Sequence, residues 1–491
     1  MSQVYGKLFK LFIFTYLLII LLSITTLFEY MHDDTRIIDH DTMSYLEDVN
    51  DNVLSIAGIG VFFYPWYGHW RHWNEPNYDP PYTWSSHYIP DIVEEAFIPE
   101  LELYDSSDEK IILWQLYMMR KAHVSYAIVS WWGPKSYEDR VFDKLMNISL
   151  KPISPHPKLK WCILYELEGY GDPDLNHIVS DLKYIIKRYG SRKNYLKVGN
   201  KPVIFVYADP DDGPEYAVKW SRAKSMLGNS VYIVLKVFPQ YRNYTRLSDS
   251  WYQYAPSTRY ELQSPFSGYV SPGFWKIGEK DPELDRNEDS FREHLIKLLN
   301  SNVGIKTIQT WNEWHEGTQV EPGQLVDTST IPYKPLQSYG EKFIEIMGQC
   351  IPNPYSYDPE IEVKIHSIHN NSYSMTIVGR GFPAEITIFI NIDDKVDIGI
   401  VNTDHNGEFT YTINYEFKDR GLHIVIAGIR DSIATYPIYI EGSLASNSES
   451  LASAIEEQVT IGSSDLLVLI ILVTIVLVII YWYLISIRKR L

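Results

Sequence analysis

Residues 303–322 read VGIKTIQTWNEWHEGTQVEP, a β-branched run followed directly by acidic and aromatic side chains. The run 303–310 has the composition of a strand, and the twelve residues from 311 hold three glutamates, two tryptophans and a histidine. Polar residues directly after a strand are typical of α/β folds, whose sites lie at the carboxyl ends of parallel strands. We therefore expect this stretch to end a strand at the mouth of such a fold.

Strand-like runs of this kind recur eight times, and most begin apolar and finish polar or aromatic. Longer segments that can form helices lie between several of them, such as 108–123 and 287–302. Alternating strands and helices predict an α/β fold with a parallel sheet, and eight strands predict a (β/α)8 TIM-type barrel over residues 56–350. An open doubly wound sheet is the structural alternative, although no GxGxxG or Walker A motif supports it. The eight runs are 58–68, 124–133, 159–169, 201–209, 230–238, 248–256, 266–274 and 303–314.

The composition excludes some classes of protein. A formal charge of −18 makes the chain a poor candidate for nucleic-acid binding, which requires basic surfaces. Aromatic residues make up 14% of the chain, which suits surfaces that stack on sugar rings, although Tyr and Trp also fill cores. The two cysteines, Cys162 and Cys350, form no metal-binding motif, and we predict neither a metal nor a cofactor.

After residue 350 the pattern changes to short alternating strands separated by turn signals. This pattern predicts a small all-β immunoglobulin-like sandwich over residues 356–441. A Ser-rich stalk, 442–464, follows it.

Both ends of the chain are apolar. Residues 1–28 are a signal peptide or an uncleaved signal anchor, and the absence of a small-x-small cleavage site favours an anchor. A linker, 29–55, follows. Residues 465–487 are long and apolar enough for a transmembrane helix, and the tail 488–491 is basic. By the positive-inside rule we expect a cell-membrane protein with a cytoplasmic tail and the bulk of the chain on the extracytoplasmic side.

Sugar hydrolysis needs two carboxyl groups, one to protonate the leaving oxygen and one to act as nucleophile or base. Glu313 and Glu316 are three residues apart, so on a helical turn their Cβ atoms would be about 5–6 Å apart. The alternative is a solvated turn with no catalytic role. No GxSxG motif supports a serine hydrolase.

Other strand ends also carry candidate residues. Glu166 and Glu168 end the third run, and strand alternation would put both on the same side, where they bind sugar hydroxyls or form a salt-bridged rim. The stretch 64–73, YPWYGHWRHW, is dense in aromatics and is interpreted as a carbohydrate-facing loop, although core packing explains part of it. Histidines such as His72 and His315 lack metal-ligand spacing, and His315 is expected to be a hydrogen-bond partner.

These residues resemble a known family. The stretch WNEWHEGTQVEP closely resembles the NEWHEGTQIE signature of glycoside hydrolase family 99, the endo-α-1,2-mannosidases and endomannanases. VFFYPWYG resembles the first strand of that family, AIVSWWGP the second and GYVSPGF the seventh. The likeness covers roughly residues 58–345. It departs at YELEGY, where the family has EPY after strand three.

The resemblance implies a (β/α)8 barrel that cleaves inside α-mannoside chains with retention and without a metal. Glu316 would be the general acid/base. Glu313 would deprotonate the 2-hydroxyl of the sugar and so close a 1,2-anhydro intermediate. The resemblance and the aromatic strand ends together give the expected substrate-binding residues, which are Tyr64, Trp66, Tyr67, Trp132, Glu166, Tyr252, Tyr254, Trp311, Asn312 and His315.

The sequence thus predicts a membrane-anchored, outward-facing, retaining endo-acting glycoside hydrolase that cleaves α-1,2-type mannosidic linkages. Its partner would be an oligosaccharide or polysaccharide substrate, with no nucleic acid. The rival interpretations are a non-catalytic surface glycan-binding protein and a structural envelope protein. A third is an enzyme that transfers sugars with the same carboxylates.

Overall fold

A computed structural model describes residues 55–68, 72–73, 87–91, 103–327, 334–369, 372–393 and 395–440 of the 491-residue chain. The described residues fall into two compact units. The first, the barrel unit, takes its residues from within 1–65, 124–143 and 158–320. The second, the β unit, takes its residues from within 66–123, 144–157 and 321–491.

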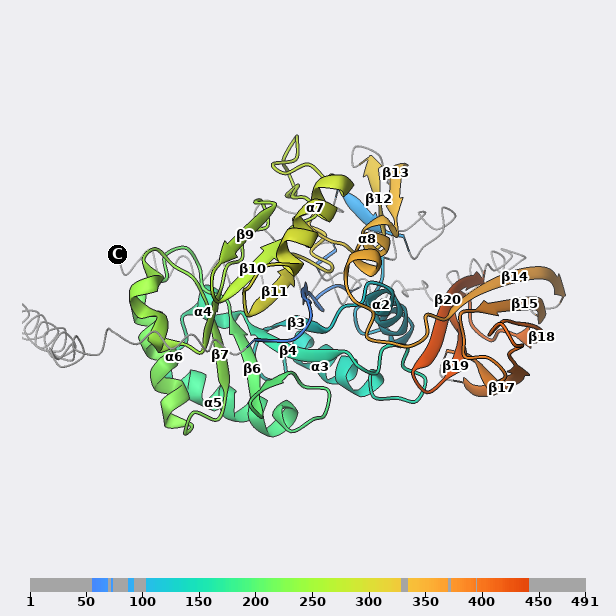
Figure 1. Ribbon diagram of the computed structural model, residues 1–491, viewed down its shortest axis with the longest axis horizontal. Coiled ribbons are helices and arrows are strands. Elements are labelled where there is room, and N and C mark those ends of the chain that lie inside the picture. Colours follow the sequence, from blue (N-terminus) through green and yellow to red (C-terminus); the bar gives the residue numbers. More distant parts are fainter. Residues whose placement is uncertain are drawn as a thin grey trace, which may run out of the picture. The chain divides into compact units, whose positions relative to one another are not determined.

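Eight parallel strands form the centre of the barrel unit (Figure 1), and each of the eight predicted runs holds one of them. The strands are neighbours in chain order, and the first strand pairs in parallel with the last, as in a barrel. The sixth and seventh strands contact each other at the remaining seam. The predicted barrel-like α/β domain is therefore confirmed. The strands are β1 (Gly60–Phe63), β3 (Tyr126–Trp131), β4 (Lys160–Tyr165), β6 (Lys201–Val206), β7 (Tyr232–Lys236), β8 (Ser250–Tyr252), β10 (Ser267–Val270) and β11 (Ile305–Ile308).

Aromatic side chains fill the interior between these strands. The Phe62 ring lies 5.7 Å from that of Tyr252 and 6.3 Å from that of Phe205, centroid to centroid. A Cβ atom on Gly60 would lie 2.1 Å from the Tyr126 ring, so β1 and β3 approach closely only because residue 60 is glycine. This packing fixes the strand ends that carry the site.

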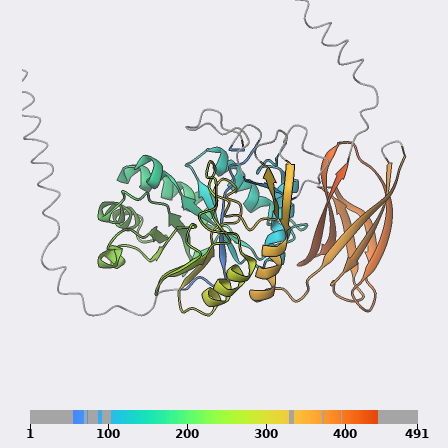
Figure 2. The ribbon, with the colours of Figure 1, turned by 90° about the horizontal axis from the view of Figure 1, so that it is seen from above.

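Helices lie outside the strands of the barrel unit (Figure 2). Side-chain caps begin two of them, because Asp174 accepts a hydrogen bond from the backbone of His177, and Asn287 accepts one from that of Ser290. The predicted helix 287–302 is confirmed as α7. The helices are α4 (Leu167–Gly171), α5 (Leu175–Ile185), the π-helix η3 (Ile186–Gly190), α6 (Pro214–Met226), the 3₁₀ helix η4 (Tyr241–Leu247) and α7 (Glu288–Leu299), and α3 (Tyr137–Ile148) runs across the boundary of the two units.

Two short strands of the barrel unit were not predicted. They are β5 (Lys197–Val198), which pairs with β6, and β9 (Tyr260–Gln263), which forms an antiparallel hairpin with β10. All four residues of β9 are half-buried and two of them, Glu261 and Gln263, are polar, so the run gives little strand signal.

The β unit holds two antiparallel sheets (Figure 2), in agreement with the all-β pattern predicted after residue 350. One sheet has the order β14-β15-β18 and the other β17-β16-β19-β20. Six of the seven strands were predicted, and the missed strand is β17. The strands are β14 (Glu360–His369), β15 (Ser372–Arg380), β16 (Thr387–Ile392), β17 (Lys395–Asn402), β18 (Phe409–Glu416), β19 (Gly421–Ile429) and β20 (Ser432–Ile440).

The β unit also contains two helices and a small antiparallel sheet. The predicted helix 108–123 is confirmed as α2 (Glu109–Lys121), whose side chains from Ile111 to Arg120 are all buried. The helix α2 contacts β19, β20 and α8 (Lys342–Cys350). The small sheet has the order β13-β12-β2, with β2 (Tyr88–Pro90), β12 (Gly323–Asp327) and β13 (Lys334–Gly340).

The two predicted membrane segments, 1–28 and 465–487, lie outside the described residues. Within the described ranges, no helix has both the length and the apolar character needed to cross a bilayer. The predicted linker 29–55, apart from its last residue, and the predicted stalk 442–464 also lie outside these ranges.

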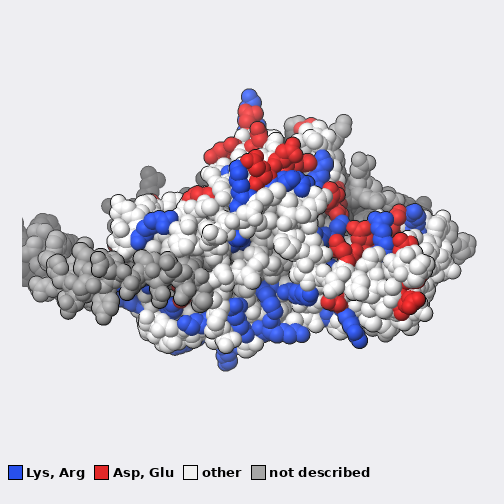
Figure 3. All heavy atoms as spheres, in the orientation of Figure 1, with Lys and Arg blue, Asp and Glu red and all other residues white. Residues whose placement is uncertain are grey.

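Acidic side chains gather over α7 and the loop before it on the face shown in Figure 3. A surface of this sign is unsuited to a polyanionic partner such as nucleic acid. The acidic residues of this segment are Glu279, Asp281, Glu283, Asp285, Glu288, Asp289 and Glu293.

Candidate active site

The motif after β11 is held by its own backbone and by β1. Thr310 N donates to Thr318 O at 2.8 Å, and Val320 N donates back to Thr310 O at 3.0 Å. Trp311 N donates to Phe62 O at 2.7 Å, which ties the motif to the end of the first strand. Residues 314–317 form a turn and not a helix, so Glu313 precedes the turn and Glu316 lies on it.

Asn312 joins the motif to β1 through both ends of its amide. The Tyr64 backbone N donates to Asn312 Oδ1 at 2.8 Å, and Asn312 Nδ2 donates to Tyr64 O at 2.9 Å. Asn312 is fully buried, so these bonds satisfy backbone groups that water does not reach. Asn312 therefore fixes the register between the strand-eight motif and Tyr64, and it stands next to Glu313.

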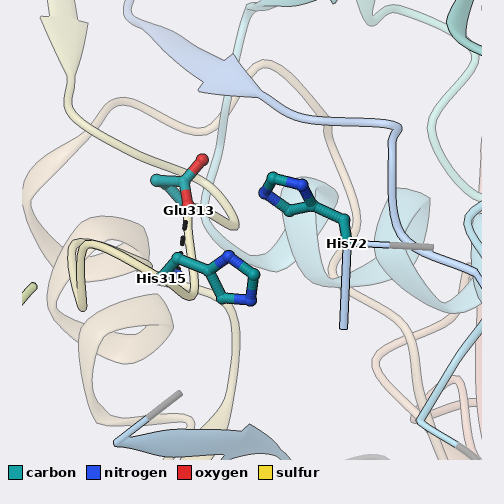
Figure 4. Close-up of side chains that lie close together, drawn as sticks. All are labelled: His72, Glu313 and His315. Atoms are coloured by element: carbon teal, nitrogen blue, oxygen red, sulfur yellow. Dashed lines mark hydrogen bonds between the residues drawn. The ribbon is translucent and has the colours of Figure 1, made fainter. Parts of the chain in front are cut away.

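Glu313 lies in a buried, hydrogen-bonded position. Glu313 is only 4% exposed, and its Oε1 accepts a hydrogen bond from the His315 backbone N at 3.1 Å (Figure 4). Its own backbone N donates to Thr310 Oγ1 at 2.9 Å. Hydrogen bonds at both its backbone and its carboxylate therefore hold Glu313 in place at the site.

Glu316 lies at the end of a chain of hydroxyl groups. Tyr64 Oη donates to Tyr254 Oη at 2.9 Å, and Tyr254 Oη donates to Glu316 Oε2 at 3.1 Å. Burial raises the pKa of Glu316, and the Tyr254 hydrogen bond and the nearby Lys276 and Lys236 counteract this effect only in part. Glu316 can therefore hold a proton above the usual pH range of a carboxyl group.

Glu166, at the end of β4, is a third buried carboxyl group in the electrostatic field of Glu316. Burial raises its pKa to about 8, while the hydrogen bond with Ser130 and the charge of Lys236 lower it, and the charge of Glu316 raises it. Lys236 at the end of β7 is held by a bond from its Nζ to Ala208 O at 2.7 Å. Ser130 of β3, Glu166 after β4 and Lys236 of β7 therefore lie at the same edge of the barrel as the motif.

Glu168 lies elsewhere, which corrects the expectation that it shares a side with Glu166. Its carboxylate accepts from Trp220 Nε1 at 2.8 Å and pairs with Lys219 at 2.7 Å. Strand alternation does not apply, because β4 ends at Tyr165 and the helix α4 begins at Leu167. Of the two rim glutamates, only Glu166 faces the candidate site.

A row of aromatic rings lies beside these carboxyl groups, and sequence reasoning found only part of it. The Trp132 ring lies 4.9 Å from that of Tyr170, which stacks on Tyr207 at 5.6 Å. Tyr207 meets Tyr254 edge to face at 6.2 Å, and Lys236 Nζ lies 4.2 Å from the Tyr207 centroid. Tyr207 and Lys236 were not predicted. Tyr207 directly follows β6 and Lys236 ends β7, so their position at a strand end is the signal that could have identified them.

The remaining predicted binding residues are more deeply placed. Trp311 is fully buried, and Tyr252 is 2% exposed with its hydroxyl donating to Val206 O at 3.1 Å. The His315 side chain is buried beside Glu313. Trp66 and Tyr67 belong to the β unit, where the Tyr67 ring lies 4.2 Å from that of Trp73. The roles of all of these residues in substrate binding stay predictions.

One acidic cluster in the barrel unit has ligand atoms close enough to hold a metal. The carboxylates of Glu168, Asp172 and Asp212 lie within 4.8 Å of one another. The Lys219 ammonium forms ion pairs with two of these carboxylates, because its Nζ lies 2.7 Å from Glu168 and 3.0 Å from Asp172. This cluster therefore fits an internal ion pair better than a metal site.

Comparison with known proteins identifies similar sequences in one family of glycoside hydrolases. The model of the family described as Glycosyl hydrolase family 99 matches residues 57–233. A glycoprotein endo-α-1,2-mannosidase from Mus musculus is 25% identical over 341 residues, which cover 56% of this chain and 71% of that protein. A glycoprotein endo-α-1,2-mannosidase-like protein from Danio rerio is 24% identical over 372 residues, which cover 62% and 79%.

Among solved structures, the family-99 endo-α-mannosidase from Bacteroides thetaiotaomicron matches with a TM-score of 0.47 and 20% identity. The match covers 60% of this chain and 96% of that one. The barrel, the motif and the sequence relatives together define an enzyme that hydrolyses glycosidic bonds. Residues 57–233 match glycoside hydrolase family 99, and the chain is endo-α-1,2-mannosidase-like.

Proposed function

We propose that the barrel unit hydrolyses internal α-1,2-type mannosidic linkages of a glycan with retention of configuration. Glu316 is the general acid/base, and Glu313 is the base that activates the sugar itself. The observation that carries the proposal is the contrast between the two carboxyl groups. Glu316 has a pKa raised by burial, whereas Glu313 accepts a backbone hydrogen bond. Two neighbouring carboxyl groups in different surroundings can supply the acid and the base of one reaction.

In the first step Glu313 removes the proton of the 2-hydroxyl, and the freed oxygen attacks C1 of the same sugar. The bond from C1 to the leaving oxygen breaks, and that oxygen takes the proton of Glu316. The product of this step is a 1,2-anhydro sugar. It differs from the usual retaining scheme, in which the second carboxylate bonds to C1.

In the second step Glu316, now ionised, takes a proton from water, and the water oxygen attacks C1. The C1–O2 bond opens, and O2 takes back its proton from Glu313. Two inversions at C1 give net retention, and both glutamates return to their starting states. Tyr254 stabilises the ionised Glu316 between the steps through its hydroxyl.

The remaining sequence expectations complete the proposal. The barrel has the TIM-type arrangement, and the two antiparallel sheets of the β unit form an immunoglobulin-like sandwich that is a spacer or a carbohydrate-binding module. The apolar segments 1–28 and 465–487 hold the chain in the cell membrane with its bulk on the extracytoplasmic side. The basic RKR at 488–490 supports this orientation.

The test uses the full-length protein in detergent with α-1,2-linked manno-oligosaccharides, and NMR reports the anomeric form of the first product. Release of di- or larger saccharides with the α configuration supports the proposal. Single-sugar release, or the β anomer, contradicts it. Glu313→Gln and Glu316→Gln should each lower kcat by about 10²–10⁴-fold, while Glu293→Gln on α7 serves as a control at an exposed ion pair.

A glycosyl fluoride of the same sugar separates the two roles. Fluoride leaves without a proton, so Glu316→Gln should regain much of the rate of the first step with this substrate. Glu313→Gln should stay inactive, because the 2-hydroxyl still needs a base. Equal recovery of both variants would mean that the two roles are assigned wrongly.

A further inference from the structure

A cleft of about 530 Å³ opens at the carboxyl ends of β7 and β8, outside the residues so far assigned. Its volume lies within the range of small-molecule sites in proteins. The loop that follows β7, the start of η4, the residue after β8 and the end of β9 line this open cleft. Its lining residues are Val237, Phe238, Pro239, Gln240, Tyr241, Arg242, Asn243, Gln253 and Gln263.

The cleft is connected to the candidate active site through the end of β8. Gln253 in the cleft directly precedes Tyr254, whose hydroxyl donates to Glu316. Gln309, just before the motif, fixes this segment, because its Nε2 donates to Gln253 O at 2.6 Å and its Oε1 accepts from Ala255 N at 3.0 Å. The cleft and the candidate site therefore share the segment that follows β8, with Gln253 lining the cleft and Tyr254 bonded to Glu316.

The polar lining of the cleft consists mainly of amides. Within the described part of the chain, the side-chain amides of Gln240, Asn243 and Gln253 have no hydrogen-bond partner. Each amide both donates and accepts hydrogen bonds, as the paired hydroxyls of a sugar do. The lining contains no carboxylate, and its one charged side chain, Arg242, donates to Ser264 O at 3.1 Å. This chemistry suits a neutral polyhydroxylated ligand better than an ion.

The floor of the cleft is aromatic and packed against the barrel. Phe238 and Tyr241 are buried, and the Tyr241 ring packs against Trp251 with their centroids 5.2 Å apart. Tyr241 Oη donates to Gln263 Oε1 at 2.8 Å, so both side chains are fixed before a ligand arrives. A preformed apolar floor with a few convergent polar groups is the usual form of a small-molecule site.

We infer that this cleft is a distal subsite that binds a neutral hexose unit of the substrate, beyond the two sugars joined by the cleaved bond. This inference rests on the proposed function and specifies its substrate as a glycan long enough to reach from Glu316 to Gln240. Binding energy from a remote sugar raises kcat/KM for long substrates and leaves short ones unaffected.

The test measures kcat/KM for α-1,2-linked manno-oligosaccharides lengthened one sugar at a time from either end. Full-length protein is made without N-glycosylation, because residues 243–245, Asn-Tyr-Thr, form a sequon at the cleft. Lengthening at one end should raise kcat/KM. Gln240→Gly and Asn243→Ala should each reduce that gain by about two- to tenfold, and cleavage of the shortest substrate should not change.

The backbone of residue 240 supplies a matched control. Gln240 has a φ of +66°, which glycine and asparagine tolerate, so neither replacement strains the loop. Gln240→Asn keeps an amide at this position and should retain more of the length dependence than Gln240→Gly. A similar effect of both replacements would assign the loss to the loop and not to the amide, and would overturn the inference.

The other outcomes are separable. If the shortest substrate is cleaved but length has no effect, or if the variants keep the full gain, the subsite is absent and the proposed function stands. If no substrate is cleaved, the proposed function fails, and saturation-transfer NMR with the longest oligosaccharide decides on the cleft. If the oligosaccharide binds and Gln240→Gly and Asn243→Ala weaken its binding, the cleft is a sugar site. If it does not bind, or if the variants bind it unchanged, the inference is wrong.

Discussion

Tyr254 Oη donates a hydrogen bond to Glu316 Oε2 at 3.1 Å and accepts one from Tyr64 Oη at 2.9 Å. Tyr64 follows the first strand and Tyr254 follows the sixth, so the relay joins opposite parts of the barrel edge at one carboxyl group. Burial raises the pKa of Glu316, and the Tyr254 bond opposes that rise. The relay therefore sets the pH at which Glu316 gives up its proton.

Replacing Tyr254 by phenylalanine should move the alkaline limb of the pH–rate profile upward. The Tyr254 hydrogen bond favours ionised Glu316, so its loss raises the pKa of Glu316 and keeps the acid protonated to higher pH. kcat/KM at neutral pH should fall by about three- to tenfold, because the ionised form loses a donor. The measurement is kcat/KM against pH on a cleaved oligosaccharide.

Tyr126→Phe is the matched control for this variant. Tyr126 is also fully buried and donates its hydroxyl to Lys306 O at 2.9 Å, but it begins β3 at the opposite end of the barrel from Glu316. It should leave the alkaline limb in place. A limb that moves equally in both variants would show that general loosening of the barrel, and not the relay, is responsible.

Glu166→Gln should leave the alkaline limb of the pH–rate profile in place. Glu166 has a pKa of about 8, so it is neutral at lower pH, where the uncharged amide of the variant imitates it. The charge of Glu316 raises the pKa of Glu166, so Glu316 ionises while Glu166 is still neutral. The measurement is kcat/KM against pH, and a limb that moves would contradict this order of ionisation.

The stability of Glu166→Gln relative to the wild type should increase as the pH rises. Folded Glu166 keeps its proton up to about pH 8, whereas the unfolded chain loses it near the ordinary glutamate value. Between these two pH values the folded state binds more protons, so the free energy of unfolding of the wild type falls as pH rises. The excess stability of Glu166→Gln should grow over this interval and then stay constant. Urea titrations at several pH values measure it, and a constant difference at all pH values would contradict the shift.

Asn312→Ala should destabilise the barrel unit and misplace Glu313. The replacement leaves the backbone N and O of Tyr64 unpaired in a buried place, which costs on the order of 2–4 kcal/mol. Asn312→Asp keeps the acceptor for Tyr64 N and loses the donor, and the comparison therefore separates the two bonds. Unfolding in urea measures the cost. An effect of Asn312→Ala below about 1 kcal/mol would show that water satisfies these groups.

The barrel was predictable because its strands are buried on both faces and read as continuous apolar runs. All eight runs became strands, and their polar ends marked Tyr64, Trp132 and Glu166 correctly as strand-end residues. The strands that escaped prediction lack this signal. β2 has three residues and ends in proline, and β17 begins within a charged stretch, DDKVD at 393–397.

The contacts of the site were less predictable than its location. The sequence places Glu166 and Glu168 two residues apart, but only the onset of α4 at Leu167 decides that they face different partners. Lys236 ends β7 and Glu166 directly follows β4, but the interaction of Lys236 with a distant carboxyl group depends on the barrel closing. The relay from Tyr64 to Glu316 joins residues that are 252 positions apart in the chain (316 − 64).

Arg120 on α2 holds together the segments of the β unit. Its guanidinium donates to Pro155 O at 2.9 Å, Asp431 O at 2.6 Å and Tyr357 O at 3.0 Å, and it lies 3.8 Å from the centroid of Tyr355. Arg120 is 1% exposed, and burial lowers its pKa. One side chain thus satisfies carbonyl groups from three separate segments that water does not reach.

Arg120→Lys should therefore destabilise the β unit by about 2–4 kcal/mol, although the charge is kept, because an ammonium lacks the planar fork that reaches several carbonyls at once. The matched control is Arg380→Lys, which affects an exposed pair with Glu360 and should cost far less stability than Arg120→Lys. Urea unfolding of the full-length protein, followed by circular dichroism, measures both. Equal costs for the two variants would show that charge, and not the shape of the guanidinium, is what the buried site requires.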